Sequence, residues 1–123
     1  MIMISINQQS KIPIFKQVIE EIKLKIASGE LERGEQLPSV RELAVSLSLN
    51  PNTIMKCYKE LEREGFVKTK MGKGVFVNEN LSDNEINNLK KNILFQKIDE
   101  LVKTARLLNI DRKEILNEIE KRY

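Results

Sequence analysis

Apolar residues recur at intervals of three and four along most of this 123-residue chain, which is the spacing of one face of a helix. Before residue 30 this face consists of Phe15, Ile19, Ile22 and Ile26, and Gly29 ends the pattern. The next stretch has Val40, Leu43, Ala44 and Leu47. A third stretch has Ile54, Cys57 or Tyr58, and Leu61, with Gly65 after it. The pattern predicts three helices, each with one apolar side.

A very short turn joins the second and third of these helices. Ser39 and Glu42 have the spacing of a capping box, so we expect the second helix to begin at Ser39. Asn50 and Pro51 are a favoured N-cap and first helical residue, and they follow soon after the second pattern ends. This separation is typical of a helix-turn-helix, which places the N-terminal end of its second helix in the major groove of DNA.

The sequence after Gly65 predicts a β-hairpin. Residues 66–70 and 75–77 have the composition of two short strands, and Gly72 and Gly74 permit the tight turn between them. Residues 66–77 contain three lysines, Lys68, Lys70 and Lys73, and no acidic residue. A basic hairpin directly after a helix-turn-helix is a wing. We therefore expect a mainly α fold with a small β wing, the winged helix-turn-helix, over residues 1–78.

Residues 79–123 form a second predicted segment, which is helical. Ser82 and Glu85 have the spacing of another capping box. An apolar seam with alternating steps of three and four then runs through Ile86, Leu89, Ile93, Leu94, Ile98, Leu101, Ala105 and Leu108. Asn109 and Ile110 interrupt it, and Asp111 and Glu114 are expected to cap a last short helix. At the other end of the chain, the alternation of Ile2, Ile4 and Ile6 suggests a short strand.

The long seam needs a covering surface. A second copy of the chain is the simplest one, because closed twofold dimers are common and a long exposed apolar stripe favours association. The residues expected at this dimer interface are Ile93, Leu94, Ile98, Leu101, Ala105 and Leu108. The alternative is that the segment folds back on its own winged domain.

Composition argues against several classes of function. The chain has no histidine, so it lacks the usual metal ligand and the usual general base. Its single cysteine, Cys57, excludes a disulfide within the chain. We expect no cofactor and no enzymatic activity, and the paired acids Asp99 and Glu100 are explained by a solvated helix face. No run approaches the roughly 20 apolar residues of a membrane span, so a cytoplasmic location without membrane contact is expected.

Several spaced motifs carry a family resemblance. They are Ile26-x-x-Gly29-x-Leu31-x-x-Gly34-x-x-Leu37-Pro38-Ser39-x-Arg41-x-Leu43-Ala44, Asn50-Pro51-Asn52-Thr53-Ile54, Tyr58-x-Glu60-Leu61-Glu62-x-Glu64-Gly65 and Gly72-x-Gly74-x-Phe76-Val77. In order and spacing they resemble the GntR family of bacterial transcription regulators, in particular its short YtrA-like branch. The resemblance covers roughly residues 4 to 78. One departure is Met71, which precedes Gly72 where many relatives have an arginine.

The resemblance implies a dimeric, sequence-specific regulator, most simply a repressor, which binds an inverted repeat in double-stranded DNA. Relatives in the short branch dimerise through a helical C-terminal segment, and the sequence indicates no particular small-molecule effector. The resemblance and the helix-turn-helix pattern together indicate the following candidates for DNA contact: Ser39, Arg41, Asn52, Thr53, Lys56, Tyr58, Lys70, Gly72, Lys73 and Gly74.

Each candidate also has a purely structural interpretation. Arg41 and the wing lysines could be solvated surface residues, Ser39 is expected to cap first and bind phosphate second, and Thr53 could cap its own helix. Tyr58 is expected to keep its hydroxyl at the surface, within reach of a phosphate. Cys57, Phe66 and Phe76 are expected in the core rather than in redox sensing or stacking. The alternative function is a winged helix that binds another protein and has no specific DNA site.

Overall fold

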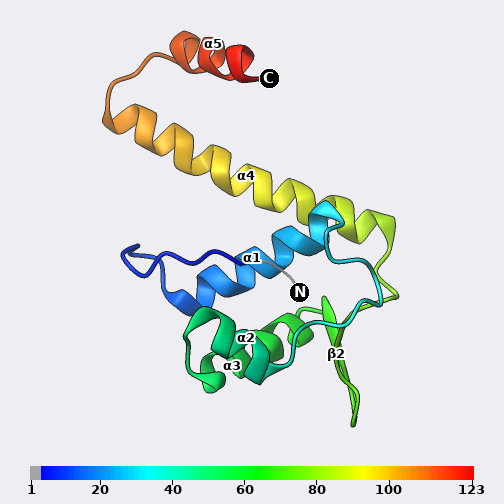
Figure 1. Cartoon of the computed structure of the whole chain (residues 1–123). Helices are drawn as coiled ribbons and strands as arrows, with labels where there is room; N and C mark the ends of the chain where they lie inside the picture. The colour runs from blue at the N-terminus through cyan, green and yellow to red at the C-terminus, as the bar shows by residue number, and fades with distance from the viewer. Residues whose placement is uncertain (1–3) are drawn as a thin grey trace. The chain divides into compact units, whose positions relative to one another are not determined.

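The computed structural model describes residues 4–123, and within that range it has five helices and one two-stranded antiparallel sheet (Figure 1). In chain order these are α1 (Ile14–Ser28), α2 (Val40–Leu47), α3 (Pro51–Arg63), β1 (Val67–Lys70), β2 (Gly74–Val77), α4 (Asp83–Leu107) and α5 (Arg112–Arg122). The mainly α fold with a small β wing is confirmed. The chain divides into two compact units, one ending at Lys90 and the other comprising Lys91–Tyr123, so the division falls inside α4.

The core of the first unit forms where α1 and α2 pack against α3. The side chains at its centre are fully or almost fully buried: Val18, Ile22, Leu43, Ile54, Cys57 and Leu61. The expectation that Phe15 belongs to this core is wrong, because its side chain is 38% exposed. Phe15 lies in the first turn of α1, at the edge of the core, and Val18 is buried in its place.

No strand forms in the described part of the N-terminal segment, residues 4–13, so the strand suggested there by Ile4 and Ile6 is wrong. Ile2 lies outside the described residues. The segment is attached to α1 by one side chain instead of by a ladder of main-chain bonds. The Gln17 amide donates to the carbonyl oxygens of Asn7 and Ile12, at 3.0 and 2.8 Å, and its oxygen accepts from the Asn7 N–H.

The turn between α2 and α3 has a left-handed residue that is not glycine. Ser48 has φ of 56°, and its N–H donates to the Val45 carbonyl while the Leu49 N–H reaches back to the Ala44 carbonyl. This is the hydrogen-bond pattern of a Schellman motif. Asn50 then caps α3 by accepting from the Asn52 N–H at 2.8 Å, and Pro51 is the first helical residue, as expected. The two motifs together fix where α3 begins relative to α2.

The wing pairs Val67 with Val77 and Lys70 with Gly74, and it closes through a turn in which the Lys73 N–H donates to the Lys70 carbonyl. Its second strand has a further partner that the hydrophobic pattern did not predict. Residues 34–37 run along the outer edge of β2, where the Leu37 N–H donates to the Val75 carbonyl and the Val77 N–H donates to the Glu35 carbonyl, both at 2.8 Å. Such pairing removes the exposed edge that β2 would otherwise present.

In the second unit, α4 ends at Leu107 and Asn109 adopts a left-handed conformation with φ of 55°, at the predicted break. The predicted side-chain cap of α5 is wrong: Asp111 holds the N-cap position, but only its carbonyl, and not its carboxylate, accepts from the Glu114 N–H. The capping box of Ser82 and Glu85 at the start of α4, by contrast, is present. No helix within residues 4–123 is both long and apolar enough to cross a membrane.

Candidate nucleic-acid interface

The N-terminal end of α2 brings Ser39 and Arg41 to the surface. Ser39 is the N-cap, as predicted: its Oγ accepts from the Glu42 N–H at 3.0 Å, and the Glu42 carboxylate accepts from the Ser39 N–H at 3.1 Å. These bonds to Ser39 hold the pKa of Glu42 below its usual value. The Ser39 hydroxyl is used as an acceptor, so its proton remains available for a phosphate oxygen. Arg41 lies exposed in the first turn of α2.

The N-terminal end of α3 is the part of the fold that would enter a groove. Asn52 and Lys56 are exposed there, and Thr53 is half-buried. The cap comes from Asn50, so the alternative in which Thr53 caps the helix is not the arrangement found. The first turn has no acidic residue. Pro51 has no N–H, and the N–H groups of Asn52 and Thr53 donate to Asn50, so the positive potential of this end comes from the helix dipole, which attracts a phosphate.

Tyr58 does not reach the surface, so the expectation of a phosphate contact from its hydroxyl is wrong. The residue is 4% exposed, and its hydroxyl donates to the Pro38 carbonyl at 2.7 Å. Burial raises the pKa of the phenol well above its ordinary value. Tyr58 instead joins α3 to the residue just before the N-cap of α2, and so helps to hold the two candidate helix ends in place.

Cys57 is the core residue that the sequence indicated. Its side chain is fully buried, and the thiol lies 3.5 Å from the Phe15 carbonyl. Burial raises the pKa of the thiol from 9.0 to about 11, so the reactive thiolate is scarce at neutral pH. Both observations favour an inert packing role over a redox role.

The wing presents two lysines and an apolar residue near its turn. Met71 is 92% exposed. Gly72 and Gly74 have φ of 73° and 122°, so glycine serves both positions of this turn. The Lys70 ammonium lies 4.6 Å from the centre of the Phe76 ring, and this cation–π contact holds the lysine side chain over one face of the wing. Phe66 and Phe76 are half-buried, and each has a lysine over its ring, Lys23 in the case of Phe66.

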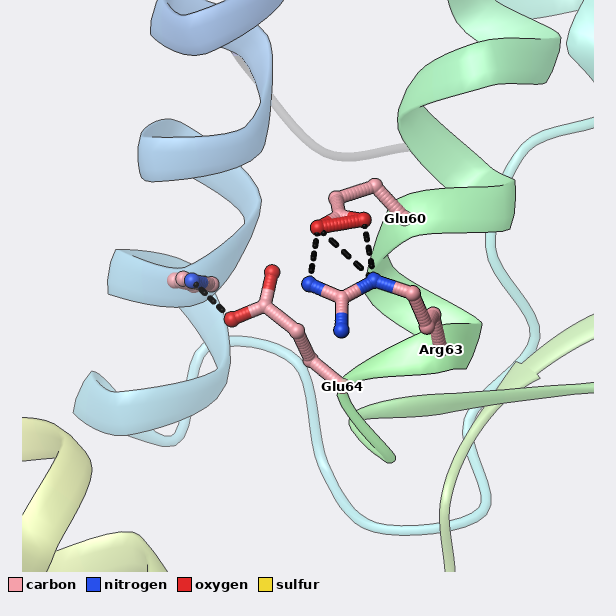
Figure 2. A network of polar contacts seen from close by, with 4 residues as sticks. Glu60, Arg63 and Glu64 are labelled. Carbon is pink, nitrogen blue, oxygen red and sulfur yellow. Dashed lines mark hydrogen bonds and ion pairs between the residues drawn. The ribbon is translucent and has the colours of Figure 1, made fainter.

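Within the described residues, the cations at the candidate interface take part in no salt bridge, as is also true of others such as Lys59 and Lys97. At the other end of α3, Arg63 pairs with Glu60, and Glu64 reaches across to Lys23 on α1 at 2.8 Å (Figure 2). Across the described part of the chain, no salt bridge involves the cations of the two helix ends or the wing, which are Arg41, Lys56, Lys68, Lys70 and Lys73. Unpaired, exposed cations on α2, α3 and the wing are available for phosphates.

Two polar side chains that support the wing were missed by the sequence analysis. The Gln36 amide donates to the Lys73 carbonyl in the wing turn at 2.8 Å. The Glu62 carboxylate accepts from the Thr69 N–H at 2.8 Å and from the Thr69 hydroxyl at 3.3 Å. Exposed Gln and Glu residues are common on any surface. Gln36 has no sequence signal that would have distinguished it, whereas Glu62 is a position of the quoted motif from Tyr58 to Gly65, to which the sequence analysis assigned no role.

Comparison with known proteins places this architecture among bacterial regulators. The family model "Bacterial regulatory proteins, gntR family" matches residues 14–77. The HTH-type transcriptional repressor YtrA of Bacillus subtilis is 35% identical over 113 residues, which are 92% of this chain and 86% of the relative. A GntR family transcriptional regulator from Listeria monocytogenes has a TM-score of 0.79 and 33% identity, over 92% of this chain and 97% of that chain.

A further solved structure contains DNA. It is AraR(DBD) in complex with operator ORE1, and its TM-score is 0.53 with 26% identity, over 62% of this chain and 93% of that chain.

Proposed function

Because the chain belongs to the GntR family of bacterial regulatory proteins and is a DNA-binding transcriptional regulator, we propose that it acts as a homodimeric repressor on an inverted-repeat operator. The observation that carries the proposal is the placement of exposed cations on all three elements of the winged helix-turn-helix, α2, α3 and the wing. Two of these elements, α2 and α3, form the helix-turn-helix, whose second helix inserts its N-terminal end into the major groove.

The proposed contacts fall into two kinds. Arg41, Lys56 and the wing residues Lys70 and Lys73 bind phosphates and set the register of the protein on the duplex. Asn52 and Thr53, at the start of α3, meet base edges, where an Asn side chain can pair with adenine and a Thr side chain with several bases. Ser39 donates its hydroxyl proton to a phosphate while its oxygen caps α2. Gly72 and Gly74 have no side chain, so the turn of the wing can approach the DNA backbone closely.

Repression in this proposal needs no chemistry. A dimer bound across a promoter excludes other proteins from the same stretch of DNA. The relative YtrA carries the name of a repressor, which supports this sign of regulation.

The homodimer is supported by apolar side chains that remain exposed in Lys91–Tyr123. Leu94 is 55% exposed, Ile98 43%, Leu101 42% and Leu108 63%. Ala105 is only 6% exposed within the single chain, so it has little surface left to contribute to an interface. A second copy would cover the stripe and place two α3 helices about a twofold axis, which matches an inverted repeat with half-sites about one helical turn apart.

The test is fluorescence anisotropy with the promoter DNA of the chain's own gene against a scrambled duplex of equal length, at several salt concentrations. We expect preference for the promoter and a steep loss of affinity with salt. The double variant Arg41→Ala, Lys56→Ala should bind about tenfold or more weakly, with a slope of log K against log salt that is shallower by about 4, because each of the two protomers loses two phosphate contacts.

The matched control is Lys113→Ala, Lys121→Ala, which removes the same charge from α5. Equal, weak binding of both duplexes that the interface variant does not change would contradict the proposal. That result would favour a winged helix that binds a protein partner.

A further inference from the structure

Each edge of the wing is bonded to another part of the first unit. Along β2, residues 34–37 supply main-chain partners, and Gln36 adds a side-chain bond to the carbonyl of Lys73 in the turn. Along β1, the outward N–H of Thr69 has no strand beside it and donates to the Glu62 carboxylate on α3. A two-stranded hairpin by itself is only marginally stable, so these bonds determine where the wing is held.

The Glu62 contact connects α3 directly with the wing. Glu62 lies in the last turn of α3, and Thr69 is the third residue of β1. One carboxylate oxygen accepts from the main-chain N–H and the other accepts from the hydroxyl of the same residue. A carboxylate that accepts two bonds restricts the angle between helix and strand more than a single bond does, and charge-assisted bonds of this kind are stronger than neutral ones.

From this geometry we propose that Glu62 is a positioning residue for DNA binding. It holds the wing at a fixed angle to α3, so that Lys70 and Lys73 meet phosphates when the N-terminal end of α3 lies in the groove. The inference rests on the proposed function, because it assumes that the wing lysines contact DNA.

Because Glu62 is acidic, its removal can either raise or lower DNA affinity, and the direction of that change distinguishes a positioning role from none. Its neighbours Glu60 and Glu64 pair with Arg63 and Lys23, but no salt bridge within the described residues involves Glu62. An acidic side chain near bound DNA repels phosphates. If Glu62 were only a surface acid, its removal would leave DNA affinity unchanged or raise it. If Glu62 positions the wing, its removal lowers affinity in spite of the favourable change in charge.

The experiment compares five variants of the full-length chain, the fifth being a combination of the first and the fourth, on the promoter duplex by anisotropy at several salt concentrations. Glu62→Ala removes the acceptor, Glu62→Gln keeps an acceptor oxygen but removes the charge, and Glu60→Ala removes an acid that does not touch the wing. The fourth variant is Lys70→Ala, Lys73→Ala, both alone and combined with Glu62→Ala. Exchange of the Thr69 amide, followed by NMR, reports the contact without DNA, and thermal melting checks that each variant is folded.

We expect Glu62→Ala to bind about five- to tenfold more weakly, with a salt slope that is shallower by about 2, one phosphate contact for each protomer, and with faster exchange at Thr69. Glu62→Gln and Glu60→Ala should bind as well as the unchanged protein or more tightly. In the Glu62→Ala background, the wing lysine substitutions should cost less than they do in the unchanged protein, because a displaced wing no longer places them on phosphates.

Two results would overturn the inference, and they are distinguishable. If the wing lysine substitutions weaken binding but Glu62→Ala does not, only the positioning role is wrong. If the lysine substitutions have no effect, the wing contact in the proposed function is wrong, and a positioning role for Glu62 in DNA binding fails with it.

Discussion

At the scale of single residues, burial decides which side chains of α3 are free to contact a ligand. Lys56 is exposed, whereas Cys57 and Tyr58, the next two residues, are buried in the core. The Tyr58 hydroxyl is already bonded to the Pro38 carbonyl, in a region that water scarcely reaches. Tyr58, two positions after a candidate phosphate contact, therefore has a structural role, because helix positions that are two apart point about 200° from each other.

The first prediction concerns this tyrosine. Tyr58→Phe removes one buried hydrogen bond and leaves the Pro38 carbonyl without its donor, so the free energy of unfolding should fall by about 1 kcal/mol. DNA affinity, measured well below the melting temperature, should fall only slightly, because the ring stays buried and continues to hold α3 in place. Urea denaturation gives the stability and anisotropy gives the affinity. If the variant has unchanged stability but weaker DNA binding, the prediction is wrong and the Tyr58 hydroxyl contacts a phosphate.

At the scale of elements, capping residues determine where the candidate helices begin. The reciprocal bonds of Ser39 and Glu42 start α2, and Asn50 with Pro51 starts α3. The left-handed Ser48 between them allows α2 to end and α3 to begin within three residues. The start of α3 is thus set by local hydrogen bonds, and the same bonds decide which residues form its exposed N-terminal end.

The capping role and the proposed phosphate role of Ser39 can be separated. Ser39→Ala loses the cap, so we expect stability to fall by about 1 kcal/mol and operator affinity to fall with it. Ser39→Asp keeps an N-cap acceptor but replaces the hydroxyl donor by a negative charge. It should preserve stability and still weaken operator binding about tenfold or more. If a stable Ser39→Asp protein binds DNA with unchanged affinity, the proposed phosphate contact of Ser39 is wrong and only its capping role remains.

At the scale of the whole molecule, the chain consists of two compact units that meet within a single helix. The first turns of α4 belong to the unit with the wing, where Leu81 and Leu89 are buried and Arg33 pairs with Asp83 at 2.6 Å. The expected domain boundary at residue 78 remains a prediction. The second unit has few buried side chains of its own, which is the physical reason to expect that it associates with another copy.

The dimer prediction concerns the exposed stripe of α4. Leu101→Lys places a charge where the proposed interface excludes water, so the protein should sediment as a monomer at micromolar concentration. Its affinity for the inverted repeat should fall by about a hundredfold or more, because the two half-sites are no longer bound together. Lys97→Ala, also on α4, is the control and should remain dimeric. A Leu101→Lys protein that is still dimeric, or a monomer with full operator affinity, would contradict the proposed assembly.

The amino-acid sequence determined the five helices, the wing and the family. Caps such as Ser39 with Glu42, left-handed glycines such as Gly29 and Gly65, and apolar residues at helical spacing act within a few residues of each other, so they are visible in the sequence. The spaced motifs also indicated the GntR family, which the match over residues 14–77 confirms.

Only the tertiary structure decided which side chains meet across those elements. Tyr58 and Pro38 are 20 residues apart, and Gln36 and the Lys73 carbonyl are 37 apart, so their contacts depend on how α3 and the wing pack. The same holds for Phe15, which has the correct spacing for the core but lies at the edge of it. Periodicity specifies which side of a helix is apolar. The depth of a residue in the core, and the partner of a polar group, depend on the other elements that fold against it.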